Sequence, residues 1–198
     1  MQIKIIHYKA GNIASVMNAL GRLGLKPEVV TGAADLRGAD KLIFPGVGHA
    51  RPAMDLLGRN GLADAIRGFG GPVLGICLGM QLMASWSEEG NTPGMDIFPG
   101  KVRHFSGTAP TPGLKIPHMG WNDVYGLQGP LFNGIPQGSH FYFVHSYYLE
   151  RGPQATALCL YGQEFSAAVE MNNFFGVQFH PEKSGEAGMT LLKNFIDL

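Results

Sequence analysis

The sequence predicts an α/β protein, with a central, mostly parallel sheet flanked by helices and a β-rich C-terminal half. Short apolar runs alternate with helix-like segments as far as residue 86, and strand-like segments dominate residues 121–179. The chain has 198 residues and a hydrophobic content of 45%, which is enough for a packed core. We therefore expect residues 1–198 to form a single domain.

The first half of the chain predicts the parallel part of the sheet. Residues 3–7 form an apolar run, Asn12 can cap a helix that starts at the next residue, and Gly24 ends that helix. The further elements that we expect here are strands at 28–30, 41–44 and 73–76 and helices near 53–57, 62–69 and 79–86. Strands that alternate with helices favour a parallel sheet covered on both faces.

The pattern changes after residue 86. Residues 87–117 are rich in Gly and Pro, and no segment is a convincing linker. The strands that we expect afterwards lie at 121–125, 140–144, 155–160, 167–171 and 174–179. Asn172 and Asn173 are typical of a hairpin turn between the last two, and a helix over 186–196 closes the chain.

Composition and charge exclude several classes of protein. Fifteen basic residues balance fifteen acidic ones without a run of like charge, so we expect neither nucleic acid nor a membrane surface as a partner. No apolar run reaches the ~18 residues of a membrane helix. The N-terminal apolar run is too short for a signal peptide, so a cytoplasmic location is expected. Two cysteines are too few for a disulfide scaffold.

The segment Gly75-Ile76-Cys77-Leu78-Gly79 predicts a nucleophile. It places a cysteine on a sharp turn between an apolar strand and a helix, the thiol counterpart of the serine elbow of hydrolases. The flanking glycines admit close backbone, and the start of a helix stabilises a thiolate. The alternative is a cysteine packed as a small hydrophobe. That alternative is favoured for Cys159, which lies between two leucines, and not for Cys77.

A thiolate needs a base, and His180 is the best candidate among seven histidines. It follows an apolar strand, and Glu182 comes two residues later, after a proline. A carboxylate that accepts one imidazole N–H leaves the other ring nitrogen free for the thiol proton. A histidine beside a glutamate is common on surfaces, so the prediction of a Cys77–His180–Glu182 triad depends on the elbow as well.

These two motifs resemble those of the class I glutamine amidotransferases. Two further segments, Pro45-Gly46-Val47-Gly48 and Pro117-His118-Met119-Gly120-Trp121-Asn122, are similar to the glutaminase subunits of imidazole glycerol phosphate synthases. The resemblance covers essentially the whole chain, with the four motifs in the expected order. It implies a flavodoxin-like sheet, one amidotransferase domain over residues 1–198, and neither a cofactor nor a metal.

By this resemblance the chain hydrolyses L-glutamine to glutamate and ammonia through a thioester on Cys77. The oxyanion donors would be the backbone N–H groups of Leu78 and Val47, although a plain glycine-rich turn is equally compatible with the latter segment. The residues implied to hold glutamine are Gly46, Gly48, Gln81, Glu89, His145, Ser146 and Tyr147. Glu89 would pair with the substrate ammonium, and the backbone of residues 145–147 would meet its carboxylate.

The implied partner is a (β/α)₈-barrel cyclase, which uses the ammonia to make imidazole glycerol phosphate and aminoimidazole carboxamide ribotide in histidine biosynthesis. The residues implied to face it in a heterodimer are Asn12, Met119, Trp121 and Lys183. A core position for Trp121 is the competing interpretation. The family segment Asp-Tyr-Gly-x-Gly-Asn is altered here, with His7 and Lys9 in place of the first and third residues, which bears on docking rather than on catalysis.

Three alternatives remain open at this stage. A paralogue that feeds ammonia to another synthase, such as one making amino sugars, would keep every catalytic motif. A hydrolase of another amide or γ-glutamyl bond would keep the triad without an ammonia-accepting partner. A thiol redox sensor would need Cys77 alone, and the motif around His180 argues against it.

Overall fold

The computed structural model describes residues 1–8, 12–107 and 113–198. The elements of its first half are β1 (Ile3–Ile6), α1 (Ile13–Arg22), β2 (Glu28–Val30), η1 (Ala33–Leu36), β3 (Lys41–Gly46), α2 (Ala50–Arg59), α3 (Leu62–Arg67), β4 (Val73–Cys77) and α4 (Leu78–Leu82). The predicted strands and the first three helices of this half are confirmed, with α2 longer than expected. Lys9, one of the two altered residues of the N-terminal segment, lies outside the described residues.

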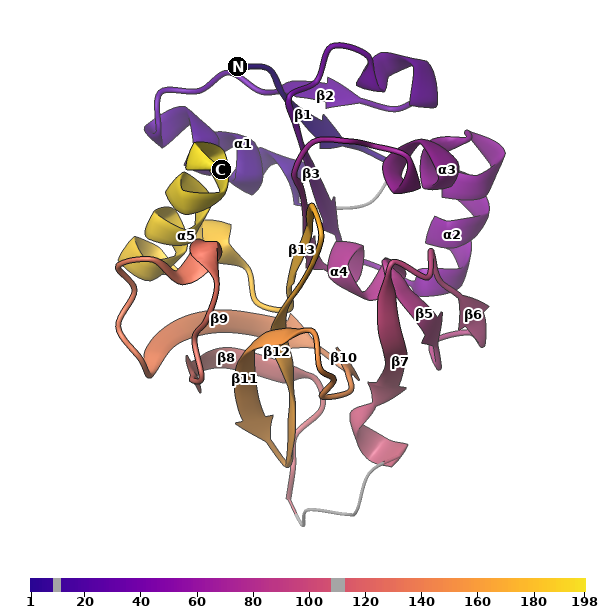
Figure 1. The fold of residues 1–198 in the computed structure, drawn as a ribbon. Coiled ribbons are helices and arrows are strands. Elements are labelled where there is room, and N and C mark those ends of the chain that lie inside the picture. The colour runs from indigo at the N-terminus through magenta and orange to yellow at the C-terminus, as the bar shows by residue number, and fades with distance from the viewer. Residues whose placement is uncertain (9–11, 108–112) are drawn as a thin grey trace.

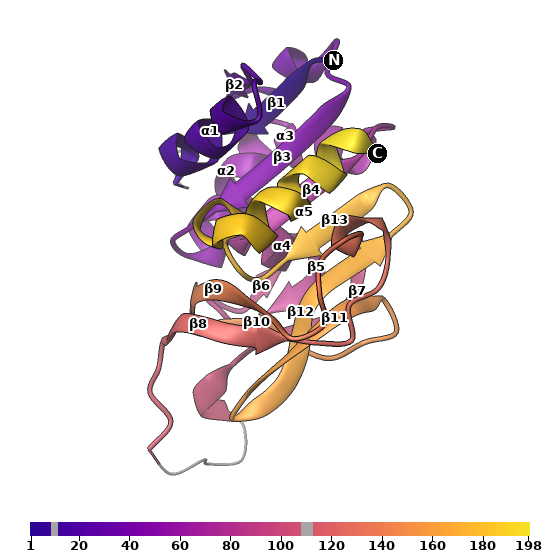
Figure 2. The ribbon, with the colours of Figure 1, turned by 90° about the vertical axis from the view of Figure 1, so that its left-hand side faces the viewer.

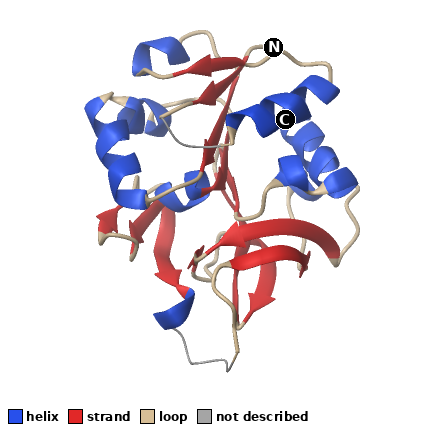
Figure 3. Cartoon of the chain, turned by 180° about the vertical axis from the view of Figure 1, so that it is seen from behind, coloured by secondary structure: helices blue, strands red, loops and turns tan. Residues whose placement is uncertain are grey.

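The second half is rich in strands, as predicted, and Figure 3 shows a group of strands at the end of the molecule away from the two termini. Its strands are β5 (Ala84–Ser87), β6 (Thr92–Pro93), β7 (Phe98–His104), β8 (His118–Val124), β9 (Ser139–His145), β10 (Tyr147–Leu149), β11 (Ala155–Tyr161), β12 (Gln163–Met171) and β13 (Phe174–Val177). The helical elements are η2 (Phe105–Gly107), η3 (Pro130–Phe132), η4 (Pro181–Lys183) and α5 (Gly185–Asp197).

The largest sheet among the described residues has seven strands in the order β11-β12-β13-β4-β3-β1-β2, and it is seen nearly edge-on in Figure 1 and with its strands labelled in Figure 2. The strands from β13 to β2 are all parallel, and β12 and β11 extend the sheet antiparallel at one edge. The turn between β12 and β13 contains Asn172 at φ 55°, so the predicted hairpin is confirmed. A smaller sheet, β10-β7-β5-β6, and the antiparallel pair β8-β9 complete the strand-rich half.

Both faces of the parallel strands are covered because their side chains alternate between two apolar clusters. Ile5, Ile43 and Ile76 pack with buried side chains of α1 and α5. Phe44 and Val73, on the same strands, pack instead with α2 and α3. Figure 2 shows α1 and α5 on one face of the sheet and the other helices beyond it. The sequence prediction of helices on both faces is confirmed.

The prediction of a helix over residues 79–86 is wrong beyond Leu82, where α4 ends. The carbonyls of Leu82 and Met83 accept hydrogen bonds from the backbone N–H groups of residues 95, 97 and 98, at 2.8–2.9 Å. Those carbonyls are therefore unavailable to a further helical turn, and the chain enters β5 instead. The strands β5, β6, β7 and β10 were not predicted: β5 overlaps the predicted helix, β6 and β7 lie in the Gly- and Pro-rich residues 87–117, and β10 has only three residues. None of the helices in the described residues combines the length and apolar character needed to cross a bilayer.

Candidate active site

Cys77 occupies a strained turn at the carboxyl end of β4. Its backbone angles are φ 54° and ψ −111°, in a region that residues other than glycine rarely adopt. The glycines beside it permit the turn. A Cβ on Gly75 would lie 2.3 Å from Met83 Cε, and a Cβ on Gly79 would lie 1.8 Å from the Phe44 carbonyl oxygen. The predicted elbow is therefore present, with its sulfur 3.9 Å from the Val144 carbonyl oxygen.

His180 and Glu182 form a buried hydrogen-bonded pair. His180 Nδ1 and Glu182 Oε1 are 2.9 Å apart, and their side chains are 4% and 1% exposed. Strand β13 runs parallel to β4, with Val177 opposite Ile76, so both strands end at the same edge of the sheet. This places His180 beside Cys77, as the sequence predicted from the strand ends.

The electrostatics of the pair favour proton transfer from the thiol. Burial by itself lowers the pKa of His180, but the charge of a Cys77 thiolate and the Glu182 carboxylate outweigh it and raise that pKa above its ordinary value. His180 Nε2 is buried and, apart from the Cys77 side chain, has no hydrogen-bond partner among the described residues. That nitrogen is thus available to accept the thiol proton, while Glu182 holds the other.

The loop after β3 approaches Cys77 from the neighbouring strand. Gly46 pairs with Cys77 in the sheet register. A Cβ on Gly46 would meet the Tyr8 hydroxyl at 2.3 Å and the Gly79 backbone nitrogen at 2.8 Å, so only glycine fits there. Val47 follows on an open loop and is 40% exposed. The predicted donor loop therefore lies beside the nucleophile.

A cavity of about 350 Å³ opens at this edge of the sheet. Its lining residues are Val47, Gly48, Cys77, Leu78, Gln81, Glu89, Pro117, Val144, His145, Ser146 and Tyr147. The structure thus brings together nine residues that the sequence predicts for the site, whereas Gly46, His180 and Glu182 lie outside this lining. Pro117 lies in a predicted motif but was given no substrate role, and Val144 was missed.

Two of the predicted substrate residues also hold the protein itself together. Glu89 Oε2 accepts the Ala50 backbone N–H at 2.7 Å, which joins it to the first residue of α2. Gln81 Nε2 donates to the Tyr147 carbonyl at 2.8 Å and to Gln178 Oε1 at 2.9 Å. Both N–H bonds of Gln81 are therefore directed into the protein.

His145 lines the cavity as the end of a chain of hydrogen bonds. Its Nδ1 donates to the Tyr147 carbonyl at 2.7 Å, which leaves its Nε2 to accept from His118 Nδ1 at 2.9 Å. His118 Nε2 then accepts from Asn122 Nδ2 at 3.2 Å. Burial lowers the pKa of His118 to about 4 and the pKa of His145 to about 3, so both rings are neutral at pH 7. The sequence predicted the position of His145 and missed the role of His118.

Three of the four residues predicted to face a partner lie on one surface. Met119 and Trp121 alternate along β8 and are 62% and 55% exposed, so the core interpretation of Trp121 is wrong. Lys183 Nζ lies 5.8 Å from the centre of the Tyr142 ring, and the Trp121 ring meets that ring edge-on at 6.1 Å. Asn12 instead caps α1, where its side chain accepts the Ser15 N–H at 3.4 Å.

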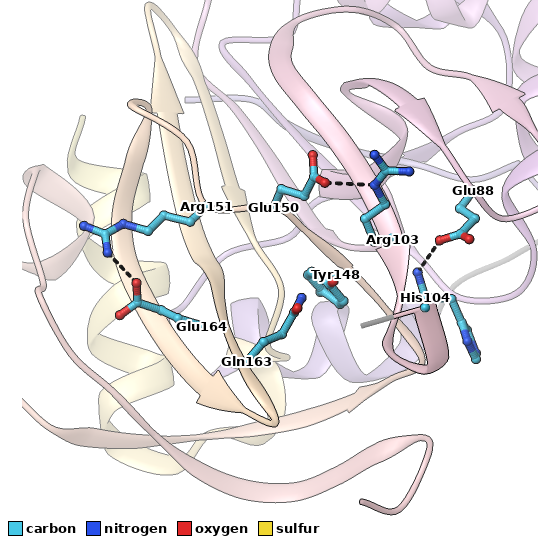
Figure 4. A pocket seen from close by; sticks show the side chains of 9 residues that line it. Glu88, Arg103, His104, Tyr148, Glu150, Arg151, Gln163 and Glu164 are labelled. Carbon is cyan, nitrogen blue, oxygen red and sulfur yellow. Dashed lines mark hydrogen bonds and ion pairs between the residues drawn. The ribbon is translucent and has the colours of Figure 1, made fainter. Parts of the chain in front are cut away.

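A second cavity, of about 310 Å³, shares no lining residue with the cavity at Cys77, and Figure 4 shows its side chains. Its lining residues are Glu88, Arg103, His104, Gly107, Tyr148, Glu150, Arg151, Gln163 and Glu164. Arg103 is 2.8 Å from Glu150, and Arg151 pairs with Glu164, so carboxylates neutralise both arginines. The remaining cysteine, Cys159, is buried, and burial raises its pKa to about 12, in agreement with the predicted structural role.

The comparisons with known proteins agree with this geometry. The family model "Glutamine amidotransferase class-I" matches residues 4–198. The imidazole glycerol phosphate synthase subunit HisH of Haemophilus influenzae is 48% identical over 198 residues, which cover 100% of this chain and 98% of that protein. The protein of the same name from Bacteroides fragilis is 46% identical over 198 residues, with 100% of both chains covered.

Solved structures with lower sequence identity share the fold. A putative GMP synthase protein from Thermoplasma acidophilum superposes with a TM-score of 0.77 at 20% identity, covering 100% of this chain and 92% of that one. A structure described as a glutamine amidotransferase gives a TM-score of 0.76 at 19% identity, covering 100% and 98%. The predicted α/β fold class is confirmed.

Proposed function

The chain belongs to the class-I glutamine amidotransferase family, and we propose that it is the glutaminase subunit of an imidazole glycerol phosphate synthase, with a role in histidine biosynthesis. The observation that carries the mechanism is Cys77 on its strained turn, beside the buried His180–Glu182 pair at the end of the neighbouring strand. A redox sensor would have no use for that pair.

The proposed reaction proceeds in two halves. The thiol proton moves to His180 Nε2, and the Cys77 sulfur attacks the side-chain amide carbon of glutamine. The resulting oxyanion accepts hydrogen bonds from the backbone N–H groups of Leu78 and Val47. As the C–N bond breaks, His180 returns the proton and ammonia leaves, with a glutamyl thioester on Cys77. Water, deprotonated by His180, then attacks the thioester and releases glutamate.

Glutamine would occupy the cavity beside Cys77. The cavity volume of about 350 Å³ suits a small amino acid together with water. In the proposed pose, Glu89 receives the substrate ammonium, and the backbone of Ser146 and Tyr147 receives its carboxylate. Gln81 would position that strand rather than donate to glutamine, because its N–H bonds already point to Tyr147 and Gln178.

The ammonia would pass, in the cytoplasm, to a partner cyclase, which we propose to be a (β/α)₈ barrel. The relatives named above are subunits of a synthase and match this chain over its whole length, which favours this partner over a paralogous synthase. The exposed surface of Met119, Trp121 and Lys183 has the aromatic and apolar character of an interface. It lies next to the site, because the Tyr142 carbonyl accepts the His180 backbone N–H at 2.9 Å.

The test is a Cys77→Ala variant assayed with glutamine, alone and with the cyclase. Loss of the nucleophile in a comparable triad lowers turnover by about 10⁶. The complex should still make its products from added ammonium salt, because the synthase reaction does not use Cys77. The matched control is Cys159→Ala, which should keep its glutaminase activity. Substantial glutamine hydrolysis by a clean Cys77→Ala preparation would refute the mechanism.

A further inference from the structure

We propose that Gln178 is a further catalytic residue, whose side-chain amide donates an N–H to the Cys77 sulfur and stabilises the thiolate. Gln178 Nε2 lies 3.6 Å from Cys77 Sγ, within the range of an N–H···S hydrogen bond. The two residues are 101 positions apart in the chain and meet because their strands are neighbours. This inference rests on the proposed role of Cys77 as nucleophile.

The orientation of the Gln178 amide follows from its neighbours. A main-chain carbonyl can only accept, so the end of the Gln81 amide that lies 2.8 Å from the Tyr147 carbonyl must be its NH₂ group. The same nitrogen lies 2.9 Å from the Gln178 amide, and the atom of Gln178 that faces it must be the oxygen. The other end of Gln178, which faces the sulfur, is therefore the NH₂ group.

Burial makes this donor effective. Gln178 is 0% exposed, and its backbone N–H donates to the Ala167 carbonyl at 2.8 Å, which holds the residue in line with β13. Gln81, which orients it, is 4% exposed. A fixed dipole in a site of low dielectric interacts with a charge more strongly than water does in bulk solvent.

The same contact distinguishes the two protonation states of the sulfur. As a thiol, Cys77 can donate its S–H to the Val144 carbonyl, 3.9 Å away. As a thiolate it is an acceptor only, and a donor that points at it favours the charged form. The proton moves to His180, so the pair becomes thiolate and imidazolium without a change in total charge. Gln178 then compensates the negative member and Glu182 the positive one.

The test compares Gln178→Met with Gln178→Glu in the full chain. Both variants remove the N–H donor. Glutamate retains an oxygen that can accept the hydrogen bond from Gln81, whereas methionine retains only a side chain of similar size and shape. The readout is the rate of alkylation by iodoacetamide as a function of pH, with thermal unfolding as a check on folding. Cys77 alone should report at neutral pH, because burial raises the pKa of Cys159 to about 12. The midpoint of the profile describes the coupled Cys77–His180 pair.

Both variants should shift the midpoint upward. For Gln178→Met we expect about one pH unit, which makes the thiolate population about tenfold smaller at pH values below the midpoint. Gln178→Glu should shift it at least as far, because a carboxylate beside the sulfur repels the thiolate. A matched control is Gln154→Met, which removes another buried amide, one that donates to the Pro99 carbonyl at 2.6 Å. Its midpoint should equal that of the unaltered chain.

Two outcomes would overturn the proposal. An unshifted midpoint in both variants would show that Gln178 does not stabilise the Cys77 thiolate. A midpoint restored by glutamate and shifted only by methionine would mean that Gln178 merely orients Gln81. If neither variant folds, the side-chain amide resonance of Gln178 in the unaltered chain should follow pH with the midpoint of alkylation, and an invariant resonance would refute the contact. Alkylation needs neither glutamine nor a cyclase, so its result is separate from that of the Cys77→Ala test.

Discussion

Gly79→Ala should destabilise the protein and disable the site, because α4 packs directly on the backbone of β3. The added Cβ would lie 1.8 Å from the Phe44 carbonyl oxygen, and real Cβ contacts do not come closer than about 3.0 Å. Either the helix or the strand must therefore move by about 1.2 Å. Strand β3 has little freedom to move, since it is hydrogen-bonded to β1 on one side and to β4 on the other.

The magnitude follows from that geometry. Overpacking of a core costs about 1–3 kcal/mol, and a clash between two backbones belongs at the upper end. In a chain of this length, a loss of about 3 kcal/mol lowers Tm by roughly 6–12 °C. If α4 moves instead, it carries Cys77 with it, and a displacement of about 1 Å can lower turnover by about 10². We expect both effects together.

Thermal unfolding and glutaminase turnover test this expectation, with Gly21→Ala as the matched control. Gly21 lies on the exposed side of α1, and a Cβ there would meet nothing within 4 Å. The free energy of unfolding of the Gly21→Ala control should rise by about 0.5–1 kcal/mol, because alanine has a higher helix propensity than glycine. If Gly79→Ala unfolds within about 2 °C of the unaltered chain and retains full turnover, the close approach of α4 to β3 is not required and the reasoning fails.

Three further predictions concern the triad, the histidine chain and the exposed surface. His180→Ala should lose nearly as much turnover as Cys77→Ala, and Glu182→Gln less, because an amide oxygen can still accept the imidazole N–H; equal and negligible losses would contradict the triad. The pKa of His118 falls from 6.5 to about 4 on folding, so the unfolded chain takes up the proton first and stability is lost as the pH falls between those values. His118→Phe should make the Tm-against-pH curve less steep there, with His145 still contributing a slope, and an unchanged slope would show that His118 does not contribute. Trp121→Ala should weaken cyclase binding by about 2 kcal/mol, roughly thirtyfold in a titration, with little change in Tm since the ring is 55% exposed; the reverse pattern would exclude it from the interface.

The sequence by itself predicted the parts of this protein that depend on local pattern. The order of strands and helices through β4 follows from short apolar runs and helical spacing, which act over a few residues. The elbow follows from two glycines around a cysteine, and the base from a histidine and a glutamate two residues apart. The resemblance then extended these motifs to the cavity, where the structure places nine of the predicted residues.

Patterns along the chain did not predict contacts between distant segments. The end of α4 depends on residues 95–98, whose backbone takes the carbonyls that another helical turn would need. The exposure of Trp121 depends on which face of β8 is covered by the rest of the protein. Alternating side chains along a strand lie on two faces, but the alternation does not say which face is exposed to solvent.

The role of Gln178 was decided by tertiary structure alone. It is a glutamine in an otherwise apolar stretch, and its function depends on Gln81 and Tyr147, which fix the direction of its amide. Hydrogen bonds act over only a few ångströms, and these two residues, 101 positions apart, come to 3.6 Å because parallel pairing sets β13 beside β4. The sequence thus specified which chemical groups the site contains, and the packing of the sheet decided which of them touch the sulfur.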